Sequence, residues 1–226
     1  MAISQKNKSI ISIFLCVVMA LALFFGFVAV KEWLLSNYRV MQSSMEPTLE
    51  EGDIVWANKV KDADYGDIVL VEVEENRTKD VFIKRVVAFG GDLIWVEKSE
   101  MQEDSFYLCR QKKDSAIEEK LIKENYDGVT MELMGYSVLP TREDGFVAIG
   151  KENAIEVPAN HVYCIGDNRN NSYDSRKMGA FSQSDVIGVV VGKGMGVFWA
   201  IAIPLTCVFL ALGLLTYFPF DKKKLK

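Results

Sequence analysis

The chain has 226 residues, enough for one domain of ordinary size or two small ones. Half of its residues are hydrophobic, its net charge is −5 and its basic residues form no stripe, which argues against a nucleic-acid-binding protein. One histidine and four cysteines are too few and too scattered to indicate a zinc site, so we expect no metal or cofactor. Cys16 and Cys207 lie within apolar runs. Cys109 and Cys164 could form a disulfide in an oxidising compartment, which the sequence leaves open.

Two long uncharged runs, residues 9–30 and 194–220, lie near the ends of the chain. Each has about the length that a transmembrane helix requires. A cleavable signal peptide is the alternative for the first run, but this run is longer than the apolar core of such peptides, and no clear cleavage site follows it. The lysines of residues 1–8 and of the tail, 221–226, predict that both termini are cytoplasmic. Residues 31–193 are then expected to form an extracytoplasmic domain between two membrane helices.

The middle of the chain predicts a mainly β domain, a barrel or a sandwich. Short apolar or alternating runs are separated by turns rich in glycine and aspartate, as is typical of such folds. Residues 97–144 interrupt this pattern with many charged residues, and we interpret them as a solvated, inserted and variable lobe. The predicted strands are Ile54–Ala57, Ile68–Val73, Val81–Ala88, Leu93–Val96, His161–Ile165 and Val186–Val191.

Ser44 lies in the turn-forming segment Gln42–Thr48 and is the first candidate nucleophile. Pro47 fixes its own φ and disfavours a helical conformation at Glu46, so we expect Ser44 on an extended, sharply directed piece of chain. Such a piece suits a hydroxyl that faces a substrate carbonyl. The simpler alternative is an ordinary turn.

A base for Ser44 has to be found among few residues. His161 is the only histidine, and its place in a turn before a strand is typical of a surface polar residue. A Ser-His-Asp triad therefore has little support. Ser-Lys pairs are a known variant of the same chemistry.

Lys84 is the best candidate for the base. Alternate residues of a strand share a face, which predicts a row of Phe82, Lys84, Val86 and Ala88, with Arg85 on the opposite face. Burial in an apolar row lowers the pKa of a lysine. Such a change is needed, because at a pKa of ~10.4 only about one lysine in two thousand is neutral at pH 7. The alternative is a strand-edge lysine with its ammonium in water.

The polar loop Gly166–Arg176 follows the strand His161–Ile165. It has too many charged residues to bury unpaired, so we expect ion pairs and turn-stabilising hydrogen bonds. Ser172 or Ser175 could donate to, or accept from, a neutral lysine and orient it. A solvated turn with local hydrogen bonds is the alternative.

Four segments taken together resemble the bacterial type I signal peptidases, a family of membrane-bound Ser-Lys endopeptidases. The resemblance covers approximately residues 9–191, and residues 97–144 match least. A lysine at position 84 fits the bacterial enzymes, because the endoplasmic-reticulum type carries histidine there, whereas the second membrane run is not general in the family. The four segments are Ser44–Thr48, Gly66–Val69, Lys84–Ala88 with Gly91 and Asp92, and Gly166–Arg176.

The resemblance implies a role for each candidate site residue. Ser44 is implied as the acylating nucleophile, Lys84 as the general base and Ser172 as the hydroxyl that positions the lysine. The backbone N–H of Ser44 is implied as one oxyanion donor. Some relatives supply a second donor from a serine two positions earlier, which is Gln42 here, so the second donor stays open. Four charged residues are implied as structural ion-pair members near the site: Arg85, Asp167, Asp174 and Arg176.

The function implied by the resemblance is removal of N-terminal signal peptides from secreted preproteins, after small residues at −1 and −3, through an acyl-enzyme. Secreted preproteins and the lipid bilayer are the expected partners, and we expect a monomer. A self-cleaving repressor would share the Ser-Lys pair, but should carry a DNA-binding helix-turn-helix instead of membrane spans. A catalytically silent, membrane-anchored interaction module is the non-enzyme alternative.

Overall fold

The computed structural model describes residues 14, 17–19, 21–22, 24–26, 28–29, 33–75, 77–99, 104–121, 125–126, 129–130, 134–135, 139–141 and 147–194. The chain divides into two compact units, Met1–Ser36 with Lys193–Lys226, and Asn37–Gly192. The described residues between 14 and 29 are helical. Within the part that is described, no helix is long and apolar enough to cross a membrane. Much of the expected span 9–30, and all of 194–220 except Gly194, lies outside the described residues.

The larger sheet has seven strands in the order β1-β2-β14-β3-β4-β12-β13. Five of the six predicted strands belong to it, and four of these five begin at the predicted residue, whereas β4 begins three residues earlier. The strands are β1 (Leu35–Arg39), β2 (Ile54–Asn58), β3 (Ile68–Glu75), β4 (Thr78–Phe89), β12 (His161–Ile165), β13 (Phe181–Ser182) and β14 (Val186–Lys193).

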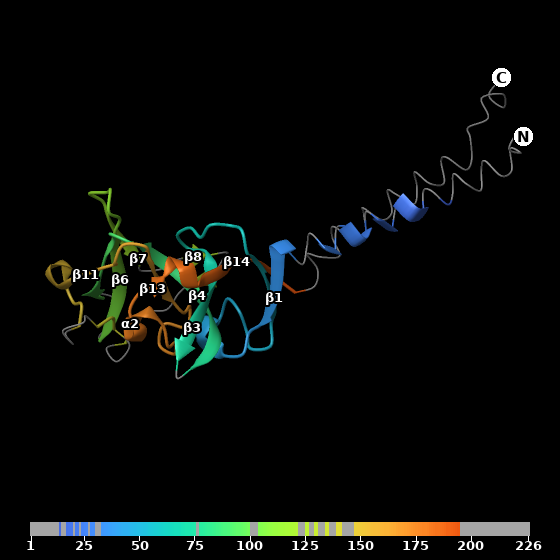
Figure 1. The fold of residues 1–226 in the computed structure, drawn as a ribbon. Coiled ribbons are helices and arrows are strands. Elements are labelled where there is room, and N and C mark those ends of the chain that lie inside the picture. Colours follow the sequence, from blue (N-terminus) through green and yellow to red (C-terminus); the bar gives the residue numbers. More distant parts are fainter. Residues whose placement is uncertain are drawn as a thin grey trace, which may run out of the picture. The chain divides into compact units, whose positions relative to one another are not determined.

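A smaller sheet has the order β10-β6-β5-β11, with β7 paired to β6. Figure 1 shows its labelled strands β6, β7 and β11 toward one end of the larger unit, with β3, β4 and β14 toward the other. The strands are β5 (Leu93–Lys98), β6 (Ser105–Gln111), β7 (Glu118–Leu121), β10 (Met134–Gly135) and β11 (Ile155–Glu156), while β8 (Asn125–Tyr126) and β9 (Val129–Thr130) pair separately. The prediction of a mainly β fold is confirmed.

Short helical turns complete the described elements. They are η1 (Ser43–Met45), η3 (Lys151–Asn153), α2 (Ser175–Met178) and η4 (Gln183–Asp185).

The main hydrophobic core lies between the two sheets, and burial of its apolar side chains is the chief stabilising contribution. Strands β4 and β12 of the larger sheet and β5 and β6 of the smaller one all contribute to it. Its buried members are Val87, Ala88, Ile94, Val96, Phe106, Leu108, Met134, Leu139, Val157, Tyr163 and Ile165.

Strand β6 corrects the interpretation of residues 97–144 as solvated. Six of its seven residues are buried, and Phe106 and Leu108 belong to the main core. The charged residues that suggested a surface lie on either side of this strand. Because β6 pairs with β5 along six residues, its burial completes the smaller sheet.

A β-bulge in β4 corrects the predicted row of residues beside Lys84. Val86 lies opposite Cys164 and Ala88 opposite Tyr163, so Val87 is an extra residue in the pairing with β12. A bulge reverses the alternation of side chains beyond it. Ala88 therefore packs with Val87 in the main core, on the face opposite Val86, and the prediction that it shares a face with Lys84 is wrong.

Candidate active site

Ser44 lies in η1, a 3-10 helix of one turn, which corrects the prediction of an extended segment. Gln42 and Glu46 on either side of the turn are extended, as Pro47 requires of Glu46. The N–H of Glu46 donates to the carbonyl of Ser43 at 3.1 Å and closes the turn, while the side chain of Met45 is fully buried. Burial of Met45 and the proline downstream thus confine the turn to three residues.

Lys84 meets Ser44 across the sheet. Its Nζ donates to Ser44 Oγ at 2.7 Å, although the two residues are 40 positions apart in the sequence. The side chain of Lys84 is 4% exposed, and its Nζ lies 5.4 Å from the centre of the Phe82 ring. The structure therefore brings together the two residues that the sequence paired and excludes the alternative of a lysine with its head in water.

The environment of Lys84 favours the neutral amine. Burial lowers the pKa of Lys84 from 10.5 to about 8, against the opposing effect of the Asp174 carboxylate, and the Arg176 guanidinium contributes to the lowering. At a pKa of about 8, roughly one lysine in ten is neutral at pH 7. This fraction is far larger than that of a solvent-exposed lysine.

Arg85 and Asp167 form a buried, bidentate ion pair. Arg85 Nε and Nη2 donate to the two oxygens of Asp167 at 2.8 and 2.6 Å, and Nη1 donates to the carbonyl of Gly66 at 2.7 Å. Thr48 Oγ1 donates to the same carboxylate at 2.6 Å. Since Arg85 follows Lys84 in β4 and Thr48 follows the Ser44 turn, this pair fixes the two segments relative to each other.

Asp174 and Arg176 form a second buried ion pair within the loop. Arg176 Nε and Nη2 donate to the two Asp174 oxygens at 2.8 and 2.7 Å. The N–H of Gly166 donates to Asp174 at 2.9 Å. Burial raises the pKa of Asp174, but the Arg176 guanidinium and the Gly166 N–H outweigh this effect and hold the pKa below its usual value. The carboxylate is therefore ionised, and it closes the loop between its two ends.

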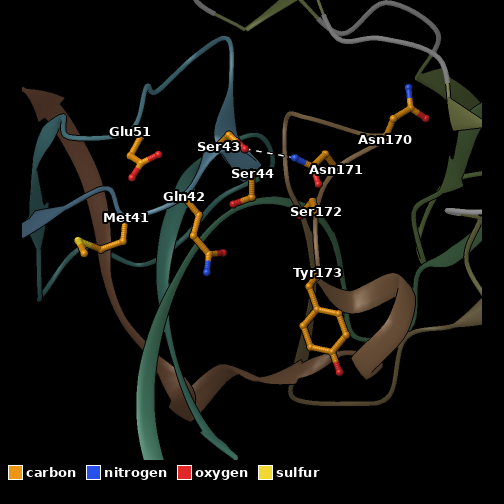
Figure 2. A pocket seen from close by; sticks show the side chains of 9 residues that line it. All are labelled: Met41, Gln42, Ser43, Ser44, Glu51, Asn170, Asn171, Ser172 and Tyr173. Atoms are coloured by element: carbon orange, nitrogen blue, oxygen red, sulfur yellow. Dashed lines mark hydrogen bonds between the residues drawn. The ribbon is translucent and has the colours of Figure 1, made fainter.

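The loop also binds the Ser44 turn through hydrogen bonds. The backbone N–H of Asn168 donates to the carbonyl of Ser44 at 3.1 Å, and its Nδ2 donates to the carbonyl of Ser43 at 3.1 Å. Asn171 Nδ2 donates to Ser43 Oγ at 3.2 Å, as Figure 2 shows. Through these contacts the loop fixes the position of the Ser44 turn.

Gly166 lies where the loop and the turn approach most closely. A Cβ at this position would collide with Ser172 Oγ and with the carbonyl oxygen of Ser44. Ser172 Oγ is itself buried, but no hydrogen bond joins it to Lys84 among the described residues. The structure thus places Ser172 next to the turn without the direct contact to the lysine that the sequence suggested.

Two cavities adjoin Ser44. A cleft of about 370 Å³ lies between residues 38–42 on one side and residues 80–84 of β4 on the other. A second cavity of about 560 Å³ is lined by residues 41–44, Glu51 and residues 170–173. Figure 2 shows Glu51 and Met41 on one side of Ser44, and residues 170–173 on the other. Ser44 therefore lies where two hollows meet.

Three other residues that the sequence singled out, His161, Cys109 and Cys164, take no part in the Ser44–Lys84 hydrogen bond. His161 Nδ1 lies 2.8 Å from the carbonyl oxygen of Ala159. Cys109 and Cys164 form no disulfide and belong to different buried clusters, which answers the open question of their pairing. Burial raises the pKa of the Cys164 thiol, so it is protonated. Within the described ranges, no group of three or more metal-ligating residues occurs.

Three contacts of the site were not found by sequence reasoning. Thr48 stands in a recognised segment, but its bond to Asp167 joins residues 119 positions apart. Asn168 binds the turn with both its backbone and its side chain. A signal was present for Gly166, because a glycine between a buried strand and a polar loop often marks a close backbone approach. For Thr48 and Asn168, no local sequence pattern indicates which residue each of them bonds.

Comparisons of the sequence with a family model and with curated proteins agree on one family. Residues 9–194 match the family described as "Signal peptidase, peptidase S26". Signal peptidase I P of Bacillus subtilis subsp. natto is 30% identical over 82% of this chain and 89% of that protein. Signal peptidase I of Streptococcus pneumoniae serotype 4 is 29% identical over 68% and 78%. Among solved structures, a signal peptidase I from Enterococcus faecalis V583 is 20% identical, with a TM-score of 0.32, over 57% of this chain and 97% of that one.

Proposed function

The chain belongs to the signal peptidase family, peptidase S26, and we propose that it removes N-terminal signal peptides from secreted preproteins with Ser44 as nucleophile and Lys84 as general base. Membership of this family makes it a serine endopeptidase. The observation that carries the proposal is the 2.7 Å contact between Lys84 Nζ and Ser44 Oγ, made by a lysine that is buried and has a lowered pKa.

The proposed reaction begins with a neutral Lys84. Its Nζ takes the proton of Ser44 Oγ while the oxygen attacks the scissile carbonyl and forms a tetrahedral intermediate. The Lys84 ammonium then donates that proton to the leaving amine, the C–N bond breaks, and an ester joins Ser44 to the signal peptide. Water attacks this ester with Lys84 again as base, which releases a carboxylate and restores Ser44.

Backbone geometry supports Ser44 as an oxyanion donor. The first N–H groups of a helical turn have no partner within the turn, and Ser44 is the second residue of η1. Its N–H is the proposed first donor to the tetrahedral oxyanion. Gln42 precedes the turn and lines both cavities, so its carboxamide lies in the region from which a second donor would come.

The cleft along β4 is the proposed site for the signal peptide. Strand β4 pairs with β3 over residues 78–85, whereas it pairs with β12 only over residues 85–89. Among the described strands, none pairs with the other edge of residues 78–84. An extended peptide can add to such an edge through main-chain hydrogen bonds, while pockets select alternate side chains. This arrangement suits small residues at −1 and −3.

The remaining site residues have proposed supporting roles. The Arg85–Asp167 and Asp174–Arg176 pairs are proposed to hold β4, the turn and the loop together. Both pairs are buried and bidentate, which supports this role. Ser172 is proposed to orient Lys84, either directly once the lysine is neutral or through a small movement of the loop.

The membrane arrangement stays a proposal from the sequence. Residues 9–30 and 194–220 would span the cell membrane, with residues 1–8 and 221–226 in the cytoplasm. Residues 31–193 would form the extracytoplasmic catalytic domain, with 97–144 as its variable part. This topology places Ser44, close behind the first span, near the surface where a signal peptide leaves the bilayer.

Cleavage of a purified preprotein by the detergent-solubilised full chain tests the proposal. We expect the wild type to cut after a small residue, located by mass spectrometry, and Ser44→Ala and Lys84→Ala each to lose at least about 10³-fold in rate. Lys98→Ala at the exposed end of β5 and Ser184→Ala serve as matched controls that keep activity. Full activity in Lys84→Ala would refute the dyad even though the chain is a peptidase.

A further inference from the structure

The cavity of about 560 Å³ has no assigned role in the reaction. It shares Met41, Gln42 and Ser44 with the cleft along β4, but no residue of β4 lines it. A polypeptide with its scissile bond at Ser44 Oγ and its signal peptide in the cleft must leave in a different direction. The second cavity offers such a direction, because Ser44 lines both this cavity and the cleft.

The walls of this cavity suit a polypeptide backbone. Most of its described lining consists of hydroxyl and carboxamide side chains, which donate to and accept from peptide groups. Its volume is within the range of pockets that hold ligands. The lining residues are Met41, Gln42, Ser43, Ser44, Glu51, Asn170, Asn171, Ser172 and Tyr173.

Hydrogen bonds within the protein hold two of the lining asparagines in place. Asn170 Oδ1 accepts from the backbone N–H of Gly135 at 2.8 Å, which ties the loop to the smaller sheet. Asn171 Nδ2 donates to Ser43 Oγ at 3.2 Å. The wall opposite Glu51 in Figure 2 is therefore anchored before any peptide binds.

Charge is unevenly distributed over the cavity. Of the described residues that line it, Glu51 alone carries a charge at neutral pH, and its side chain is exposed. A carboxylate in this position attracts a lysine or arginine side chain and repels an aspartate or glutamate. Selection by charge is therefore expected on this side of Ser44.

We propose that this cavity binds the first residues of the mature chain, at +1 and +2, and that Glu51 favours basic over acidic side chains there. The inference rests on the proposed function, because it assigns the cleft along β4 to the signal peptide. It adds a specificity-determining residue on the leaving-group side of the scissile bond.

Pairs of preprotein peptides that are identical up to −1 and carry lysine or glutamate at +1 and +2 test this site. We expect the full-length wild type to cleave the lysine peptide with a kcat/KM about three- to tenfold higher at low ionic strength. The ratio should approach one in Glu51→Gln and invert in Glu51→Lys. Glu50→Gln, an exposed neighbour that does not line the cavity, should keep the wild-type ratio.

The ratio is measured within each enzyme preparation, so a partly folded variant does not change it. Raising the salt concentration should shrink the wild-type preference, because exposed charges are screened. Equal rates in the wild type, or a preference that survives Glu51→Gln, would overturn the inference and leave the proposed function intact. Failure to cleave either peptide would instead overturn the proposed function, and this inference with it.

Discussion

Lys84, the proposed general base, is also a residue whose burial is costly for the stability of the fold. Below pH 8 the lysine carries its proton in both the folded and the unfolded chain, and the fold has to bury an ammonium. Because burial lowers its pKa from 10.5 to about 8, this ammonium lowers the free energy of unfolding by about 3 kcal/mol. Between pH 8 and 10.5 the unfolded chain binds more protons, so the cost disappears as the pH rises.

Replacing Lys84 by an apolar residue of similar length should therefore stabilise the protein. We expect Lys84→Met to raise the free energy of unfolding by about 3 kcal/mol at pH 6, and to lose most of this advantage near pH 10.5. Urea unfolding at the two pH values measures the difference. Lys79→Met, on the exposed part of β4, should show no comparable gain. A less stable Lys84→Met at pH 6 would mean that the contacts of the ammonium outweigh its burial.

At the scale of elements, the site depends on the fit of three segments that are distant in the sequence. The loop 166–176 bonds the turn η1 through Asn168, and it bonds strand β4 through the buried Arg85–Asp167 pair. Removing one member of such a pair leaves an uncompensated buried charge.

The Arg85–Asp167 pair gives a direct test of this dependence. Asp167→Asn should lower the free energy of unfolding by about 3–5 kcal/mol, since the buried Arg85 would lose its counter-charge. Glu118→Gln, which breaks the exposed pair with Lys151, should cost at most about 1 kcal/mol. Chemical denaturation of both variants measures the two effects. Similar small losses in both would show that the buried pair does not hold the segments together.

Local patterns predicted the elements better than their contacts. Alternation and glycine turns were enough for β2, β3, β5, β12 and β14. The bulge at Val87 was not predictable, because it appears only when β4 pairs with β12, far along the chain. Strand β6 was missed because its apolar run, Phe106–Cys109, lies between charged segments that suggested a solvated surface. The Ser44–Lys84 pairing was anticipated because the residue types suggest a reaction, whereas Thr48 and Asn168 suggest none.

At the scale of the whole molecule, the proposed nucleophile Ser44 lies between two cavities. One hollow runs along the edge of β4 and the other is bounded by the polar loop. Their meeting point at Ser44 is what a peptidase needs, because a substrate must enter on one side of the scissile bond and leave on the other. The family relationship shows a serine peptidase, and this geometry supports the proposal that Ser44 is its nucleophile.

The pH dependence of kcat/KM tests the central claim, that a neutral Lys84 activates Ser44, most directly. Since the amine must be unprotonated, activity should rise about tenfold per pH unit and level off above an apparent pKa of about 8. His161→Gln, which removes the one histidine, should leave this profile unchanged. A profile that levels off between about pH 6 and 7 and disappears in His161→Gln would contradict the account, because a histidine would then be the base.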